Sequence, residues 1–598
     1  MSLTEADLTA ADAAWDLEPL LGDGTVDDLL DRAEALTGVI AGYRGRLAEL
    51  DAEGWVAVMT TTAELHDALS RAGNYASLQV ATDTADPAKG ALMAKVQERA
   101  TALSTQLIFF DLEWAALDDA TAEAVLADAR LSFCAHHLRA ARRYRPHLLS
   151  EPEERIDTEK SQTSSSAWSR LFGELISAIE LRLPGQDGTV RLEQGLALLS
   201  HPDREVRRDA ARAVTEGLTP GLRTRAFIFN TLLLDKSVDD RLRSYPTWLS
   251  SRNLANEASD ASVDALVEAV VRRYDIPQRW YRTKADILGL DRLADYDRSA
   301  SVASSEQPFG WSAAKDLVLD SYGSFSPQLA DAARRFFDEA WIDAPVRAAK
   351  RPGAFCAYTV PSHHPYLLLN WTGKRRDVLT LAHELGHGLH AYLAREQGIF
   401  HMSTPLTLAE TASVFGETVT FGRLLEDTTD PAERLALLAE SVEGAIATVF
   451  RQTAMNRFEH AIHTHRREVG ELSIDDFGTY WAQTQTAMLG DAVEVTDDYR
   501  TWWSYIPHFI NTPGYVYAYA YGQLLALSVY KRYEEGGAEF VPRYLELLAA
   551  GGSMAPERLA AIVDCDLADP TFWDGGLDII DGQLQAATEA ARAAGRLG

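Results

Sequence analysis

The residues with the clearest capacity for chemistry lie in one short segment. Residues 382–390 read Ala-His-Glu-Leu-Gly-His-Gly-Leu-His and contain the pattern H-E-x-x-H, with His383, Glu384 and His387 at its fixed positions. On a helix, positions i and i+4 share a face, so the two imidazoles can converge on one ion. Zinc suits such a pair of nitrogens, and the glutamate would act as general base toward a metal-activated water. We therefore predict a helical zinc site, with His390 as a supporting residue that does not bind the metal.

The flanks of this pattern are apolar. Residues 378–393 carry apolar side chains nearly all the way round a helical projection, which predicts a buried helix. Polar side chains in a buried helix need partners, and a metal ion would supply them. The alternative is that His383 and His387 are core histidines satisfied by hydrogen bonds, an interpretation that suits a single histidine better than a pair.

A third ligand is expected from a later helix, because a catalytic zinc usually takes three protein ligands. Residues 408–417 read Leu-Ala-Glu-Thr-Ala-Ser-Val-Phe-Gly-Glu, where Glu410 interrupts a small and apolar helical face. Glu417 lies two turns along the same face and is either the ligand in place of Glu410 or an acceptor that orients an imidazole. We predict that His383, His387 and Glu410 bind one Zn2+ per chain and that Glu417 supports an imidazole.

The elements that must position these residues are mainly helical. Apolar residues recur at helical spacing over residues 26–131 and 192–271, and helical patterning resumes at residue 377 and continues with interruptions through both metal motifs. Residues 354–371 differ, because aromatic and β-tolerant residues flank a proline-bounded turn there. This segment is predicted to form a β-hairpin.

Candidate domain boundaries lie in polar and turn-rich segments. A chain of 598 residues exceeds what one compact core usually holds, so two or three packed parts are expected. Boundaries are expected either in the polar stretch 150–166 or near the segment Pro-Gly-Gln-Asp-Gly at residues 184–188. We predict an N-terminal helical domain over residues 1–190 and a catalytic domain over residues 191–598.

Together these motifs resemble a known family, the zinc oligopeptidases typified by thimet oligopeptidase and, more closely, oligoendopeptidase F. The resemblance rests on the motif of residues 383–390, on Glu410-Thr-Ala-Ser413, on Gly353-Ala-Phe ahead of residues 365–371, and on His508 ahead of residues 515–519. Weaker similarities, such as Trp15-Asp-Leu-Glu-Pro-Leu, extend it over nearly the full length.

The resemblance implies a mainly α, two-lobed peptidase fold around a deep substrate channel, with the zinc helix at its floor and a small β-sheet beside it. It implies short, unstructured peptides as substrates, because folded proteins cannot enter such a channel. It also implies that His508 and Tyr515 donate hydrogen bonds to the oxyanion formed during hydrolysis, and that Tyr519 contacts the substrate. Tyr517 and Tyr521 are predicted to pack in the core.

The predicted hairpin offers an edge to which an extended peptide can add as a strand, with Ala354 and Tyr358 as predicted substrate contacts. Because hydrogen bonds to main chain do not distinguish side chains, we expect broad sequence selectivity. The predicted function is that of a zinc-dependent oligoendopeptidase, a metallopeptidase that hydrolyses internal bonds of short peptides, with Glu384 as general base and then general acid.

Two alternatives use the same residues. One is a metallocarboxypeptidase or dipeptidyl carboxypeptidase, which trims peptides from the C-terminus with the same zinc helix. The other is a non-catalytic peptide-binding scaffold in which H-E-x-x-H is a relic or a chance match. The intact Glu384 argues against a relic.

Composition and sequence pattern limit the binding partners and the cellular compartment that we expect for the protein. A formal net charge of -31 disfavours nucleic acid and anionic membranes, since binding to phosphates needs clustered Lys and Arg. The sequence shows no apolar run of the length that a membrane span needs, and residues 1–21 lack the pattern of a secretory signal. Cys134, Cys356 and Cys565 are too widely spaced to suggest a disulfide framework. We predict a cytoplasmic protein that binds short peptides, and the sequence carries no signal of its oligomeric state.

Overall fold

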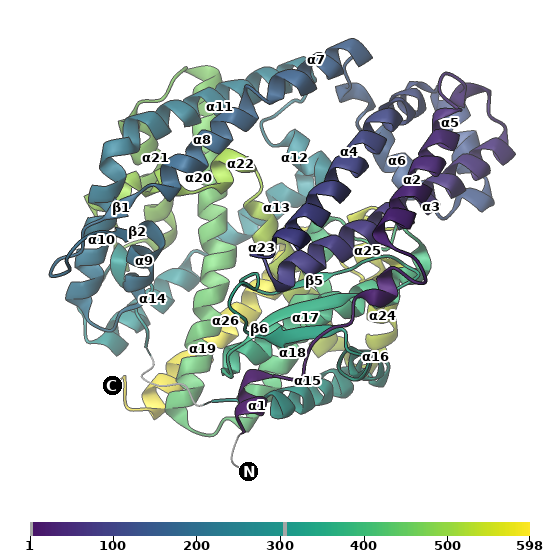
Figure 1. Ribbon diagram of the computed structural model, residues 1–598. Helices are drawn as coiled ribbons and strands as arrows, with labels where there is room; N and C mark the ends of the chain where they lie inside the picture. Colours follow the sequence, from purple (N-terminus) through teal and green to yellow (C-terminus); the bar gives the residue numbers. More distant parts are fainter. Residues whose placement is uncertain (1–3, 303–307, 598) are drawn as a thin grey trace. The chain divides into compact units, whose positions relative to one another are not determined.

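The computed structural model describes residues 4–302 and 308–597, and helices make up most of this part of the chain (Figure 1). The predicted mainly helical fold with small sheets is thereby confirmed. The chain forms two compact units, each assembled from three separate segments. The first unit holds Met1–Arg145, Glu306–Asp427 and Val529–Asp566, and the second unit holds Pro146–Ser305, Thr428–Ser528 and Leu567–Gly598. The predicted domain boundary at residue 190 lies inside the second unit, and the assignment of a catalytic domain to residues 191–598 stays a prediction.

The first unit combines long N-terminal helices, a small sheet and the helices that carry the predicted metal motifs. A capping box begins helix α2 (Val26–Ala41), where Asp28 accepts hydrogen bonds from the main chain and side chain of Thr25. In the hydrophobic core of the N-terminal helices, Trp55 and Trp114 pack edge to face with ring centroids 5.1 Å apart. The helices are α1 (Glu5–Thr9), α2 (Val26–Ala41), α3 (Ala52–Thr82), α4 (Pro87–Ala116), α5 (Asp119–Leu126), α6 (Ala135–Arg142), α15 (Trp311–Phe325), α16 (Pro327–Asp338), α17 (Arg375–Ala394), α18 (Leu406–Asp427), α24 (Val541–Ala550) and α25 (Pro556–Ala560).

The second unit is almost entirely helical and has an aromatic core around Phe229, Phe458 and Trp503. Its helices are α7 (Glu151–Ser161), α8 (Ser165–Ser177), α9 (Leu192–Ala197), α10 (Arg204–Leu218), α11 (Leu222–Leu242), α12 (Ser250–Ala255), α13 (Asp260–Arg272), α14 (Asp275–Leu288), α19 (Pro431–Ala445), α20 (Gln452–Glu468), α21 (Ile474–Leu489), α22 (His508–Asn511) and α26 (Pro570–Ala593); α23 (Tyr517–Gly536) begins in it. Two short sheets pair β1 (Glu180–Leu181) with β2 (Val190–Arg191) and β3 (Leu293–Ala294) with β7 (Val493–Glu494).

A three-stranded sheet in the first unit contains the predicted hairpin. Its strands β4 (Ile342–Pro345), β5 (Phe355–Ala357) and β6 (Tyr366–Trp371) lie in the order β4-β6-β5. The β5 and β6 strands pair antiparallel, with Cys356 opposite Leu367, so the hairpin prediction is confirmed. The parallel partner β4 was not predicted, because four residues are too few to show a pattern. Since β5 is a terminal strand, its outer edge has no strand partner within the described residues.

Helix α17 packs between this sheet and α18, and two glycines allow it to do so. A Cβ at Gly386 would overlap the carbonyl oxygen of Ala412, so α17 and α18 touch backbone to backbone at this point. A Cβ at Gly388 would lie 2.6 Å from Cε1 of Phe336, which fixes the packing on the opposite side. The helix begins where Asp377 accepts hydrogen bonds from the main-chain N–H groups of Thr372 and Lys374.

None of the helices in residues 4–302 and 308–597 is both long and apolar enough to cross a membrane. Cys134, Cys356 and Cys565 are all free thiols.

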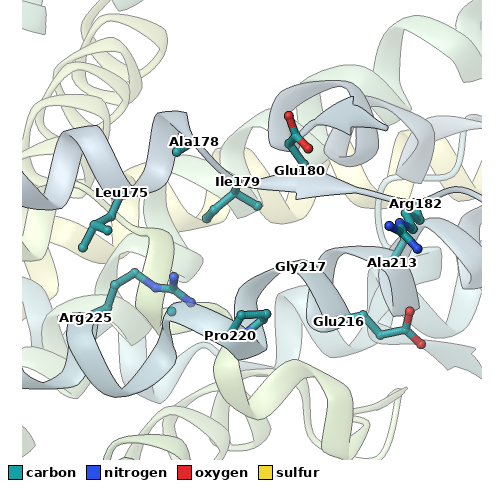
Figure 2. A pocket seen from close by; sticks show the side chains of 11 residues that line it. Leu175, Ala178, Ile179, Glu180, Arg182, Ala213, Glu216, Gly217, Pro220 and Arg225 are labelled. Carbon is teal, nitrogen blue, oxygen red and sulfur yellow. The ribbon is translucent and has the colours of Figure 1, made fainter. Parts of the chain in front are cut away.

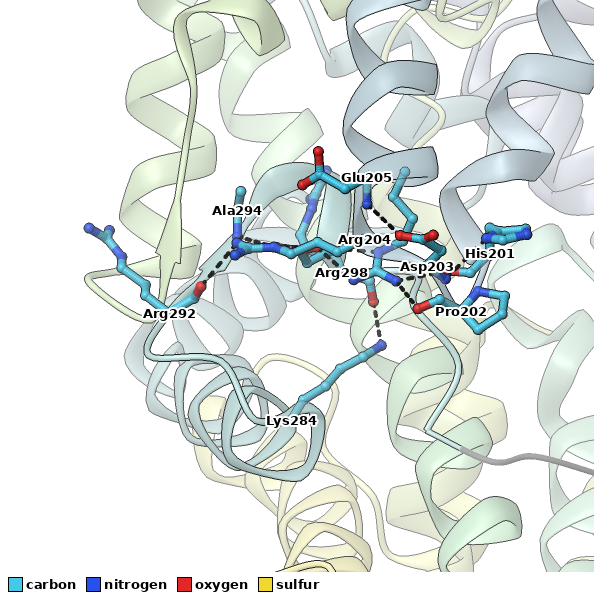
Figure 3. Close-up of polar contacts among 11 residues, drawn as sticks. His201, Pro202, Asp203, Arg204, Glu205, Lys284, Arg292, Ala294 and Arg298 are labelled. Atoms are coloured by element: carbon cyan, nitrogen blue, oxygen red, sulfur yellow. Dashed lines mark hydrogen bonds and ion pairs between the residues drawn. The ribbon is translucent and has the colours of Figure 1, made fainter. Parts of the chain in front are cut away.

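A buried ion cluster joins several helices of the second unit (Figure 3). Asp297 is fully buried and accepts hydrogen bonds from the guanidinium groups of Arg204 and Arg207, with closest distances of 2.8 and 2.9 Å. Its second oxygen also accepts from the main-chain N–H of Ala294 at 2.9 Å. The ammonium of the buried Lys284 donates to the carbonyl oxygen of Arg298 and to Glu443. The cluster thus connects α10, α14 and α19.

Replacing Asp297 with alanine is expected to lower the free energy of unfolding by about 3–5 kcal/mol, because the buried guanidinium of Arg207 would lose its counter-ion. The exposed Asp291 offers a matched control nearby. Asp291→Ala should change the free energy of unfolding by less than about 0.5 kcal/mol. Urea unfolding followed by circular dichroism measures both variants, and equal stabilities would contradict a structural role for the cluster.

Candidate active site

Three side chains from α17 and α18 converge on one point in the first unit. His383 and His387 lie one turn apart on α17, with ring centroids 5.0 Å apart. Oε2 of Glu410, on α18, lies 3.3 Å from Nε2 of His383 and 3.6 Å from Nε2 of His387. One ligand atom from each of the three lies within 4.8 Å of the other two, which is the spacing of a metal-binding group. The structure therefore brings together the three residues that were predicted to bind zinc.

Hydrogen bonds fix the orientation of these side chains. Nδ1 of His383 lies 3.0 Å from Oε2 of Glu417, and because a carboxylate only accepts, this nitrogen carries the proton. The other nitrogen, Nε2, faces Glu410 and is the one available to bind a metal ion. His387 hydrogen bonds to the main chain of Ala409, and Ser413 donates to Oε2 of Glu410 at 2.7 Å.

The donor set fits a divalent metal ion. Two imidazole lone pairs and a carboxylate oxygen that face one another repel unless a positive charge lies among them. Burial lowers the pKa of His383, but the hydrogen bond to Glu417 and the charges of Glu410 and Glu417 outweigh it and raise the pKa to about 9. The cluster therefore attracts positive charge. Two histidines with one glutamate form one of the ligand sets of catalytic zinc sites.

Glu384 lies beside the converging residues and is 8% exposed. Burial is the main cause that raises the pKa of its carboxyl to about 7, and His383 opposes this shift while Glu410 adds to it. The carboxylate also acts on the thiol of Cys356, whose pKa is raised by burial and by the charge of Glu384. Strand β5 thus runs next to the glutamate.

The predicted substrate contacts on the hairpin flank this strand. Ala354 precedes β5 and Tyr358 follows it, and both are half-buried. The Tyr358 ring centroid lies 6.5 Å from that of His387. Burial raises the pKa of the Tyr358 phenol well above its usual value, and the charges of Cys356, Glu410 and Glu384 add to the shift. Tyr358 is therefore a neutral hydroxyl group close to the converging residues.

His390 lies on the same helix and is 2% exposed. Burial lowers the pKa of its imidazole to about 3, with a smaller contribution from His387. Its Nδ1 has no hydrogen-bond partner among the described residues. A supporting role for His390 stays a prediction.

His508, Tyr515 and Tyr519 form a second group, which belongs to the second unit. The Tyr519 hydroxyl lies 3.1 Å from Nε2 of His508, and the rings of His508 and Tyr515 stack with centroids 6.2 Å apart. Burial lowers the pKa of His508, which favours the neutral imidazole. Their predicted catalytic roles stay predictions.

The two other tyrosines of this stretch have the packing role predicted for them. Tyr517 and Tyr521 are fully buried. Their hydroxyl groups lie 2.9 Å from Nδ2 of Asn256 and 3.2 Å from Oγ of Ser262, respectively.

The sequence did not identify Glu459, a buried residue of α20 that supports this group. Its Oε1 accepts a hydrogen bond from the main-chain N–H of Gly514 at 2.8 Å, directly before Tyr515. Gly514 has a φ of 75°, a conformation that favours glycine. The sequence shows only that Glu459 is an acid on the apolar face of the helix, which it shares with Met455 and Ile462. That position alone does not indicate which group the acid would contact.

Comparisons with known proteins show which family the chain resembles. The sequence matches the profile described as Peptidase family M3 over residues 320–578 and that described as Oligopeptidase F over residues 113–180, together more than half of the chain. It is 26% identical to Oligopeptidase PepF of Bacillus subtilis (strain 168), with 97% of this chain and 87% of that protein covered. It is also 26% identical to Group B oligopeptidase PepB of Streptococcus agalactiae serotype III (strain NEM316), with 95% and 96% covered.

Solved structures share the fold. The crystal structure of a protein from Chlamydophila abortus superposes with a TM-score of 0.87 at 21% identity and covers 97% of this chain and 98% of its own. Oligoendopeptidase-F from Enterococcus faecium superposes with a TM-score of 0.72 at 21% identity, with 95% and 99% covered. The profile matches and the relatives lead to one conclusion: the chain belongs to peptidase family M3 and is a metallopeptidase.

Proposed function

We propose that the chain is a zinc-dependent oligoendopeptidase that hydrolyses internal peptide bonds of short, unstructured peptides, and that it acts in the cytoplasm. The observation that supports this proposal is the convergence of His383, His387 and Glu410 on one point, with the buried Glu384 beside it. The names of the relatives, which are oligopeptidases, support the substrate class.

His383, His387 and Glu410 would hold the zinc ion. Zinc in this position supplies a Lewis acid, which makes water a nucleophile near neutral pH and polarises the peptide carbonyl. Glu417 keeps the proton of His383 on Nδ1, so that Nε2 stays available as a ligand. Ser413 donates to the carboxylate of Glu410 and restricts its rotation.

Glu384 performs the proton transfers in this proposal. Its carboxylate accepts a proton from the attacking water as the carbonyl carbon is attacked. It then passes that proton to the departing nitrogen, which must leave as an amine because an amide anion is a poor leaving group. The position of Glu384, next to a ligand on the same turn of α17, suits one carboxylate for both steps.

The terminal strand β5 is the proposed binding edge for the peptide. Strand β5 (Phe355–Ala357) already pairs with β6 along one edge. An extended peptide would form main-chain hydrogen bonds with its other edge. Ala354 and Tyr358, at the two ends of this strand, are the proposed contacts. Because main-chain hydrogen bonds do not distinguish side chains, peptides of many sequences would bind to this edge.

We retain the proposed roles of His508 and Tyr515 as neutral donors to the oxyanion, and of Tyr519 as a substrate contact. The support is the resemblance to the family together with the mutual contacts of these three side chains. Neutral donors stabilise a developing negative charge without competing for the metal.

Glu384→Gln is expected to lower the turnover of an internally quenched peptide by about 10²–10⁴-fold, because the amide cannot accept the proton from water. Zinc content should remain at the wild-type value, since no ligand is changed. Glu396→Gln, at an exposed position just after α17, is the matched control and should leave turnover unchanged. Wild-type turnover in Glu384→Gln would refute the proposed role.

Glu417→Gln is expected to weaken zinc binding by about 10–100-fold, because the carboxylate that orients His383 and increases its basicity is lost. Competition with a chromophoric chelator measures the affinity directly and does not require activity. Glu426→Gln changes an exposed acid on the same helix and should bind zinc as the wild type does. Equal zinc affinity of Glu417→Gln and the wild type would rule out this function of Glu417.

Peptides blocked at both ends are expected to be cleaved at internal bonds, since the proposed binding edge needs only main chain. Mass spectrometry of the products locates the bonds. A chelator should stop cleavage and added Zn2+ should restore it. Cleavage restricted to peptides with a free C-terminus would instead support the carboxypeptidase alternative.

A further inference from the structure

A pocket in the second unit contains none of the residues assigned above. It has a volume of about 410 Å³ and lies between the strand residue Glu180 and the connection from α10 to α11 (Figure 2). Leu175, Ile179, Ala213 and Pro220 give it an apolar lining. In Figure 2 the side chain of Ile179 points toward the pocket, whereas that of Glu180 points away from it, on the opposite side of the chain.

A buried arginine reaches into this apolar space. Arg225, in the first turn of α11, is 2% exposed, and its guanidinium points toward Pro220 (Figure 2). One N–H group, Nη2, donates to the carbonyl oxygen of Leu218 at the end of α10. Nε has no hydrogen-bond partner in the part of the chain that the structure describes.

The charge of Arg225 also has no counter-ion among residues 4–302 and 308–597. Burial alone shifts the pKa of its guanidinium, to about 10, without a contribution from any carboxylate. A carbonyl oxygen satisfies one donor but does not neutralise the charge, and an unpaired buried charge is costly. A ligand carboxylate would pair with a guanidinium through two parallel hydrogen bonds.

A glycine gives the guanidinium its position. A Cβ at Gly221 would overlap Nη1 of Arg225, so a larger residue there would displace the guanidinium. The charged residues of the lining are two acids, Glu180 and Glu216, and two bases, Arg182 and Arg225. The two signs balance, so the lining carries no net negative charge that would repel an anion on entry.

We propose that this pocket binds a small carboxylate that carries an apolar group, with the carboxylate on Arg225 and the apolar group against Leu175, Ile179 and Pro220. Such a ligand has two sources, a free short-chain acid and the C-terminal residue of a peptide. Both present the same carboxylate and apolar group, so the chemistry of recognition is shared. The proposal does not depend on hydrolysis by the first unit.

Calorimetry on the full-length chain tests the proposal with 4-methylpentanoate and with N-acetyl-Ala-Leu, and the Glu384→Gln variant is used so that the peptide stays intact. Dissociation constants of roughly millimolar size are expected for ligands this small. N-acetyl-Ala-Leu-amide lacks the carboxylate and should not bind. Binding of both acids indicates that the carboxylate and its apolar group suffice, whereas binding of the peptide alone identifies a C-terminus as the ligand. Absence of binding by both acids, or equal binding by the amide, would overturn the proposal.

Two variants place the ligand at the guanidinium. Arg225→Met should weaken binding at least about tenfold, because the charged hydrogen bonds are lost. Arg223→Met removes the same charge from an exposed position of the same helix turn, outside the lining, and should bind as the unchanged chain does. If Arg225→Met fails to fold in a thermal unfolding control, Gly221→Ala keeps the arginine but displaces its guanidinium, and should weaken binding in the same direction. Unchanged binding in a folded Arg225→Met or Gly221→Ala variant contradicts the site.

Discussion

The site depends on one constraint. Three side chains that donate electron pairs are held close together where α17 and α18 cross. His383, His387 and Glu410 repel one another unless a proton or a metal ion lies among them, so the helices must hold them in place against that repulsion. Two contacts fix the position of α17, one with α18 and one with α15. Gly386 lets α17 meet the main chain of Ala412, and the Tyr322 hydroxyl of α15 donates to the carbonyl oxygen of Ala382 at 2.9 Å. The glycine inside the H-E-x-x-H motif thus allows close packing, while its neighbours are the proposed metal ligands and the proposed base.

The same packing gives Glu384 its environment. Helix α17 has α18 on one side and the sheet, together with Phe336 of α16, on the other, and Glu384 is buried. Burial then raises the pKa of Glu384 into the neutral range. The close approach of helices that positions the proposed ligands therefore also gives the proposed base a pKa near neutrality.

The sequence predicted the helical fold class and the convergence of His383, His387 and Glu410, but not the packing of distant segments. Helices α17 and α18 are long and strongly patterned, and His383, Glu384 and His387 lie within one turn, so local spacing was sufficient. Glu410 could be predicted because an acid on an apolar helical face requires a partner. Local pattern does not indicate which distant segments pack together. The sequence therefore gave no indication that residues 306–427 pack with residues 1–145, that Asp297 pairs with Arg204 and Arg207, or that Glu459 supports the main chain before Tyr515.

The division of each unit into three chain segments has a consequence for biosynthesis. The first unit lacks its last segment until Val529–Asp566 has been made, and the second unit ends with Leu567–Gly598. A ribosome adds residues one at a time, so both hydrophobic cores stay incomplete through most of translation. Contacts of such long sequence separation also form slowly. The nascent chain should therefore depend on chaperones that shield its apolar helices until the segments from Val529 onward have been made.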